Sequence, residues 1–219
     1  AEEASALRRA KIAYEIVPGV TSVVAVPAYP GIPVTQRGMA SSFAVITGHE
    51  NPLKDDTSIR WESLATACDT LVCLMGVSEL PNIVARLTAH GRARSTPCAV
   101  IEWGTLPRQR VVTGSLGTIV SRVRRAKIQP PAVLVVGEVV SLRQSLNWFE
   151  AKPLFGKRIV VTRAADNAAS LTRQLEALGA EVEELPAIEL APVKQNGLLR
   201  EALREEAKPD WVFFTSPEG

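Results

Sequence analysis

The feature that most constrains the fold is a regular alternation of short apolar runs with amphipathic segments, which begins at residue 42. The apolar runs, such as TLVCLM and PAVLVVGEVV, are typical of strands, and the continuous ones suit a sheet that is buried on both faces. Gly91 stands where a glycine commonly ends a helix. The sequence therefore predicts an α/β fold, with strands over residues 42–47, 70–75, 97–103, 108–114 and 131–140 and helices over 60–67, 80–90 and 116–126.

A second unit follows residues 148–156, where WFEAKPLFG mixes aromatic residues, Pro and Gly without periodicity and predicts a linker. The net charge changes sign there: residues 1–150 carry 16 basic and 12 acidic groups, whereas residues 151–219 carry 9 and 11. The βαβαβ pattern beyond the linker implies a parallel sheet with right-handed crossovers. Its strands are predicted over 157–163, 180–185 and 211–216, and its helices over 166–178 and 198–207.

The first forty residues are organised differently. Residues 1–10 are predicted to be the end of an amphipathic helix, and residues 14–17 to be a short strand that ends at a Pro-Gly pair. Thr21 and Ser22 then offer N-cap side chains for a short helix that two prolines end early.

Composition argues against several classes of protein. The 21 uncharged residues 16–36 could span a bilayer, but four prolines among them would break the hydrogen bonding of a membrane helix. A net charge of +2 and 5% aromatic residues argue against nucleic-acid binding. Cys68, Cys73 and Cys98 share no C-x-x-C spacing, so neither a metal site nor a disulfide framework is predicted. The start has no signal-peptide core, and the chain is predicted to be cytoplasmic.

Three segments rich in Gly or Pro mark a candidate ligand site. VPGVTS lies between a predicted strand and a predicted helix, while LMG (74–76) and EWGT (102–105) each follow a strand and so lie at the carboxyl edge of the sheet. A Met there can pack on a flat heterocycle, and a Gly lets a backbone approach it closely. Each segment alone is better explained as a core, turn or connecting element, but three on one edge favour a binding site.

Two arginines add to this edge. Arg108 and Arg110 lie in the turn after EWGT, where their planar side chains would suit a substrate that carries carboxylates. The basic residues over 122–127 are better explained as a solvated helix face. No phosphate-binding loop, nucleophile elbow or H-E-x-x-H motif is present, so the residues by themselves predict a ligand edge and no reaction.

At this point the sequence resembles a known family. YEIVPGVTS, AYPGIPVTQRG, SSFAVITGHE, LVCLMG, IEWGTLPRQRVVTGSL and PPAVLVVGEVV are together similar to uroporphyrinogen-III C-methyltransferases, in order from residue 1 to about 150. These enzymes transfer methyl groups from S-adenosyl-methionine to uroporphyrinogen III and form precorrin-2, for sirohaem and cobalamin. GKRIVVTRA, LGAEVEELPAIEL and WVFFTSPEG resemble the first half of uroporphyrinogen-III synthase, which is fused to the methyltransferase in some bacteria.

The resemblance implies domains and a fold class. It places the end of the methyltransferase N-terminal lobe at 1–40, its C-terminal lobe at 41–150, a linker at 151–156 and a partial synthase at 157–219. The expected fold is a tetrapyrrole-methylase-type α/β lobe followed by an incomplete βαβαβ parallel-sheet domain. The family is typically dimeric, so a homodimer through the methyltransferase part is expected.

The resemblance also implies roles for individual residues. The positions that match the family's S-adenosyl-methionine site are Thr21, Ser22, Met75, Gly104 and Ala132. The positions expected to contact the tetrapyrrole are Arg37, Arg108 and Arg110 in the methyltransferase part and Arg163, Thr215 and Ser216 in the synthase part. In TQRG, Gln36 replaces the His that is usual before the arginine.

The ends of the sequence suggest a piece of a longer protein, because it begins inside a predicted helix without Met and stops after a strand signal. The family's G-x-G-P-G-D loop and its acid–base residues would precede residue 1. We therefore expect no catalytic residue and no metal in this fragment, and no activity of the fragment alone. Two alternatives stay open: a related precorrin methyltransferase, and a non-catalytic α/β binding module.

Overall fold

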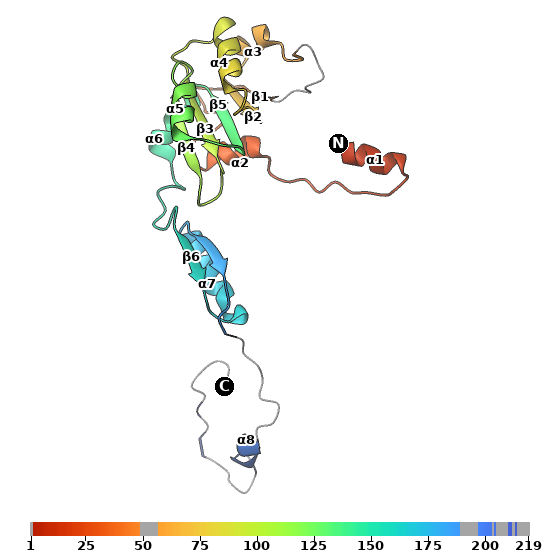
Figure 1. Cartoon of the computed structure of the whole chain (residues 1–219), viewed down its shortest axis with the longest axis vertical. Coiled ribbons are helices and arrows are strands. Elements are labelled where there is room, and N and C mark those ends of the chain that lie inside the picture. The colour runs from red at the N-terminus through yellow and green to blue at the C-terminus, as the bar shows by residue number, and fades with distance from the viewer. Residues whose placement is uncertain are drawn as a thin grey trace.

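The computed structural model describes residues 2–48, 57–188 and 197–202, together with residues 204, 210, 211 and 213. Figure 1 shows an N-terminal helix on an extended arm, a unit built around a five-stranded sheet, and a smaller unit that contains β6, α7 and β7. Among the helices of these described residues, none combines the length and the apolar character needed to cross a membrane.

The sheet of the larger unit is mixed, with the strand order β1-β2-β5-β3-β4. Its strands are β1 (Phe43–Thr47), β2 (Thr70–Leu74), β3 (Pro97–Glu102), β4 (Arg110–Ser115) and β5 (Ala132–Val136). β1 and β2 are parallel, whereas β5 is antiparallel to both β2 and β3. β2 and β3 therefore run in the same direction, and Leu74 and Ile101 near their carboxyl ends both pair with Val133. The prediction that LMG and EWGT lie at one edge of the sheet is confirmed.

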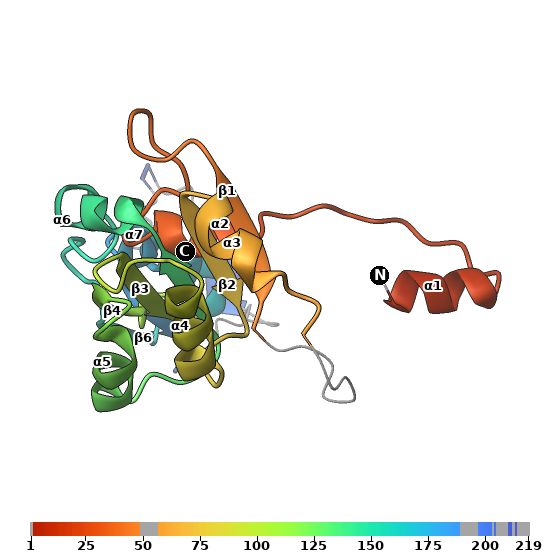
Figure 2. The same ribbon diagram turned by 90° about the horizontal axis from the view of Figure 1, so that it is seen from above.

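Both faces of the central strands β2, β5 and β3 are buried, as the apolar runs predicted. Side chains alternate along β2: Leu71 and Cys73 belong to one core cluster, while Val72 and Leu74 pack in the other. The first core lies under the helices α3 (Trp61–Ala67), α4 (Leu80–Ala89) and α5 (Ile119–Ala126). The second lies under α2 (Ser22–Ala28) and the 3-10 helix η1 (Glu138–Leu142), which is followed by α6 (Arg143–Leu146). Figure 2 shows α4 and α5 together on one side of the sheet.

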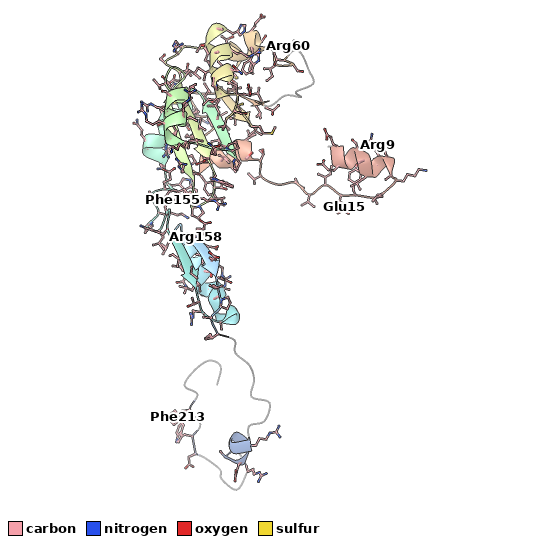
Figure 3. All side chains as sticks on the ribbon, in the orientation of Figure 1. Arg9, Glu15, Arg60, Phe155, Arg158 and Phe213 are labelled. Atoms are coloured by element: carbon pink, nitrogen blue, oxygen red, sulfur yellow. The ribbon has the colours of Figure 1, made fainter. Side chains whose placement is uncertain are left out.

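The N-terminal arm departs from the prediction. The helix α1 (Glu2–Arg9) is present, but the strand predicted over 14–17 is wrong, because this stretch is extended and exposed with no regular structure. A strand forms only when its backbone pairs with a neighbour. Within the described ranges no strand runs beside this stretch, which projects away from the sheet (Figures 1 and 3). At its end, Thr21 caps α2 as predicted: its Oγ1 accepts a hydrogen bond from the Val23 N–H, with an N···O distance of 3.3 Å.

The smaller unit confirms a parallel β-α-β arrangement. β6 (Arg158–Val161) and β7 (Glu181–Glu184) are parallel and are connected by α7 (Ala165–Ala177). The helix predicted over 198–207 corresponds to α8 (Gly197–Ala202) in the described part of the chain. The third strand, predicted over 211–216, falls mostly outside the described residues, so the full βαβαβ order stays a prediction.

Residues 148–156 pack against both units. The ring of Phe149 lies 4.7 Å from the ring of Tyr29, at the end of α2, and 5.4 Å from the ring of Phe155. The Leu154 N–H donates to the Leu178 carbonyl at 3.0 Å, at the end of α7. Figure 3 labels Phe155 at the junction of the two units. This segment therefore joins the units through its own side chains and backbone.

Candidate functional site

A pocket of about 910 Å³ opens at the carboxyl edge of the sheet, beside the ends of β2 and β3. This volume is in the range of small-molecule sites. Its walls are the start of α2, the segments that follow β2 and β3, and the start of β5. The lining residues are Ser22, Val26, Leu74, Met75, Val77, Ser78, Ile101, Trp103, Gly104, Thr105, Leu106, Pro130, Pro131, Ala132 and Val133.

Four of the five residues predicted to bind a cofactor line this pocket. Ser22, Met75, Gly104 and Ala132 come from four separate segments and meet here because β5 inserts between β2 and β3. Thr21 is not among the lining residues; its side chain caps α2, so it orients the helix that carries Ser22. The structure thus gathers residues that span more than a hundred positions of the sequence.

Gly104 allows α2 to pack tightly against the turn that follows β3. A Cβ atom at this position would lie 2.4 Å from Cγ1 of Val26, well inside van der Waals contact. No other residue has a side chain small enough for this approach. Gly104 therefore sets the distance between two walls of the pocket.

The backbone around the pocket is unusual in a way that the sequence did not indicate. Met75, Trp103 and Thr105 have left-handed backbones, with φ of +53°, +50° and +73°. They are three of the five non-glycine residues with positive φ in the described part of the chain. Such conformations are uncommon for residues other than Gly, Asn and Asp, and they cluster at functional sites. They identify the segments after β2 and β3 as the specialised part of the site.

The two arginines predicted in the turn form other contacts and do not line the pocket; Arg108 lies in the turn, whereas Arg110 is the first residue of β4. The Arg110 guanidinium pairs with the buried carboxylate of Glu102 at 3.0 Å. The Arg108 guanidinium lies 4.3 Å from the centre of the Trp103 ring and pairs with Glu181 of β7 at 3.3 Å. Of the other predicted substrate contacts, Arg37 lies in an exposed turn and Arg163 is exposed beyond β6. Thr215 and Ser216 lie outside the described residues.

Sequence reasoning missed two buried polar residues next to the pocket. Glu102 is 3% exposed and also accepts the Gln129 N–H at 2.7 Å, while Gln109 is 4% exposed and accepts the Thr105 N–H at 3.1 Å. Glu102 ends an apolar strand at a position where an inward side chain is expected, and this was the available signal. No sequence pattern indicates that the Gln109 side chain accepts a hydrogen bond from Thr105 within the turn.

The lining residues that the structure describes could bind and orient a ligand, but among them there is no proton-transfer group. They are mostly apolar, with the hydroxyls of Ser22, Ser78 and Thr105 as polar side chains and no acid, base or cysteine. Burial raises the pKa of the Cys73 and Cys98 thiols to about 12, so neither is a thiolate near neutral pH. Within the described ranges, no cluster of potential metal ligands is present.

The fold and the pocket together define a class: an α/β domain with a pocket of small-molecule size at the carboxyl ends of β2 and β3. The mostly apolar walls suit a heterocycle better than a phosphate or a sugar.

Two protein families match two different parts of the chain. The chain belongs to the family of tetrapyrrole (corrin/porphyrin) methylases, whose profile matches residues 1–120. Residues 169–219 match the profile of uroporphyrinogen-III synthase HemD. A methylase portion is thus followed by a synthase-like portion, in the order that the sequence resemblance implied.

Individual relatives agree with this order. The chain is 43% identical over 217 residues to a uroporphyrinogen-III C-methyltransferase of Bacillus subtilis, covering 98% of the chain and 44% of that protein. It is 39% identical over 218 residues to the porphyrin biosynthesis protein HemD of Ruminiclostridium josui, covering 100% of the chain and 43% of that protein. The chain therefore spans less than half the length of these two relatives.

A solved structure supports the fold. The uroporphyrin-III C-methyltransferase of Thermus thermophilus, complexed with S-adenyl homocysteine, matches with a TM-score of 0.54 and 33% identity. The match covers 64% of this chain and 60% of that structure.

Proposed function

We propose that this chain is the S-adenosyl-methionine-binding part of a uroporphyrinogen-III C-methyltransferase that is fused to a uroporphyrinogen-III synthase. The whole protein would convert uroporphyrinogen III to precorrin-2. The observation that carries this proposal is the convergence of Ser22, Met75, Gly104 and Ala132 on one pocket. The names of the relatives and the ligand of the Thermus thermophilus enzyme support it.

The pocket fits the adenosyl part of this cofactor. Met75 and Ala132 offer apolar contact to a flat ring, and Gly104 allows α2, which carries Ser22, to lie close beside it. The few hydroxyls could serve the ribose. When bound, S-adenosyl-methionine supplies an electrophilic methyl group. The residues of this chain would hold the donor in line with a pyrrole carbon, and this positioning is a large part of the catalysis of such a transfer.

The remaining sequence expectations stay proposals. We propose the boundaries 1–40, 41–150, 151–156 and 157–219 for the parts of the chain, and a homodimer through the methyltransferase part. Arg37 and Arg163 are exposed and able to meet substrate carboxylates, whereas Arg108 and Arg110 would first have to leave their ion pairs. We propose that the chain alone binds the donor but does not methylate, since the lining residues in the described part of the chain include no proton-transfer group.

Calorimetric titration of the chain with S-adenosyl-homocysteine tests the site. We expect saturable binding, which Ala132→Phe abolishes because the ring fills the pocket. Ala85→Phe, on an exposed face of α4, is the matched control and should bind normally. A folded wild-type chain that produces no binding heat contradicts the proposed site and favours the non-catalytic module.

A methylation assay distinguishes a uroporphyrinogen-III methyltransferase from a related precorrin methyltransferase. Incubation of the full-length protein with S-adenosyl-methionine and uroporphyrinogen III should give precorrin-2. A full-length protein that methylates only a later corrin intermediate would support the related precorrin methyltransferase instead. Turnover by the 219-residue chain alone would overturn the expectation that it is inactive.

A further inference from the structure

The turn that follows β3 is held by a buried side chain that belongs to neither the pocket nor the strands. Gln109 Oε1 accepts the N–H of Thr105 at 3.1 Å, and the Gln109 N–H donates to the Leu106 carbonyl at 2.8 Å. Thr105 is one of the residues with a left-handed backbone, and both it and Leu106 line the pocket. The Gln109 amide thus stabilises an unfavourable backbone at the pocket wall.

Gln109 is itself held from the segment that joins the two units. Its Nε2 donates to Oε1 of Glu150 at 3.0 Å. The other carboxylate oxygen, Oε2, accepts Nη2 of Arg143 at 2.7 Å and Nδ2 of Asn147 at 3.3 Å. The side chains of Arg143 and Glu150 are only 20% and 18% exposed, so water weakens this pair little. A charged, partly buried pair therefore fixes the far end of the Gln109 amide.

The same turn also contacts the smaller unit. Arg108 stacks on Trp103, a pocket residue, and pairs with Glu181 of β7. This pair is about half exposed on the arginine side, so it is a weaker restraint than the Glu150 network. The pocket wall is thus in contact with the synthase-like part of the chain through Arg108, and with the segment that joins the two units through Gln109.

We propose that Glu150 is a positioning residue for the cofactor pocket, acting through Gln109 on the backbone of Thr105. The proposal rests on the proposed binding of S-adenosyl-methionine and adds that the junction with the second unit controls the shape of the site. A carboxylate suits this role because it accepts from Gln109 and from Arg143 at once, which no neutral side chain does equally well.

Two measurements on the 219-residue chain test this role. Hydrogen exchange reports the Thr105 amide directly, and calorimetry reports the affinity for S-adenosyl-homocysteine. Glu150→Ala should increase exchange at Thr105 and weaken binding at least about fivefold, since a hydrogen bond to a charged group is lost. Glu150→Gln keeps an acceptor for Gln109 and should recover part of both. Glu138→Ala, which removes an exposed carboxylate at the start of η1, should change neither.

A double-mutant cycle of Glu150→Ala and Gln109→Ala provides a second check, which does not depend on any one variant folding well. If Glu150 and Gln109 act through the same series of hydrogen bonds, the double variant should lose little more affinity than either single variant. Additive losses, or an affinity that Glu150→Ala leaves unchanged, overturn the proposal. A wild-type chain that binds no S-adenosyl-homocysteine contradicts the proposed function instead, and unaltered exchange at Thr105 in Glu150→Ala refutes the positioning role in either case.

Discussion

Gly104→Ala is the substitution for which the structure gives the most defined expectation. The new methyl carbon would lie 2.4 Å from Cγ1, 2.9 Å from Cγ2 and 3.0 Å from Cβ of Val26. Carbon atoms in favourable contact are about 3.5–4.0 Å apart, so the first overlap exceeds about 1 Å. Val26 is 9% exposed and packs in the core, which limits its freedom to move. We expect a loss of about 1–3 kcal/mol in the free energy of unfolding, as for other overpacked cores.

When Val26 is truncated, the methyl group at position 104 should cost little further stability. Val26→Ala alone deletes two methyl groups and should cost about 2 kcal/mol, from lost burial and the cavity left behind. In the double variant the methyl group introduced at position 104 would occupy part of that cavity. We therefore expect the double variant to be about as stable as Val26→Ala alone, with a favourable interaction energy of about 1–3 kcal/mol.

Urea unfolding followed by circular dichroism measures the four free energies of this cycle. Gly19→Ala is the control, because a Cβ there meets nothing within 4 Å, and it should change the free energy of unfolding by less than about 1 kcal/mol. Additive losses in the double variant would refute the steric argument. S-adenosyl-homocysteine titration completes the test: Gly104→Ala should weaken binding, since it displaces α2 and with it Ser22.

Three other predictions follow from individual side chains. Met75→Ala should weaken S-adenosyl-homocysteine binding about fivefold in calorimetry but leave the melting temperature nearly unchanged, because this side chain is 63% exposed at the pocket. Burial raises the pKa values of the Cys73 and Cys98 thiols to about 12, so in a thiol-labelling assay at about pH 8 they should react only after denaturant is added. Rapid labelling of the native chain would contradict their burial. The Ser41 N–H donates a hydrogen bond to the Asp69 carboxylate and lowers the pKa of that group. The ionised carboxylate therefore stabilises the folded protein fully above its pKa in the unfolded chain, about 3.9, and this stabilisation is lost as the pH falls through the pKa in the folded protein. Asp69→Asn should therefore reduce the acid sensitivity of the urea midpoint, and an identical pH profile in both proteins would exclude this contribution.

The sequence allowed the strands and most helices to be predicted, and it also held a signal for their order. The runs that form β2, β3 and β5 are almost wholly apolar and become the central strands, whereas β1 and β4 are partly exposed at the edges. The apolar run of β5 favours a central position in the sheet, and the structure places it between β2 and β3. The prediction of a strand over 14–17 was wrong. No strand of the described residues lies beside this stretch, so its backbone gains no ladder of hydrogen bonds.

The sequence predicted that certain residues would lie together at this edge, but it did not predict the backbone conformation there. Ser22, Met75, Gly104 and Ala132 were placed at one edge from strand ends and resemblance, and the structure gathers them there. The left-handed backbone of residues such as Thr105 could not be foreseen, because a β-branched residue is among the least expected in that conformation. Tertiary contacts stabilise it, and these have no local pattern.

The segment 148–156 shows how irregular packing escapes periodicity arguments. It has no repeat because its contacts point in several directions: Trp148 donates to the Ala28 carbonyl at 3.1 Å, Phe149 packs edge to face with Tyr29, and Glu150 accepts a hydrogen bond from Gln109. Flexible linkers are rich in Gly, Ser and other small or polar residues, whereas this segment contributes large aromatic rings. Aromatic residues without periodicity therefore indicate a packed junction between the two units.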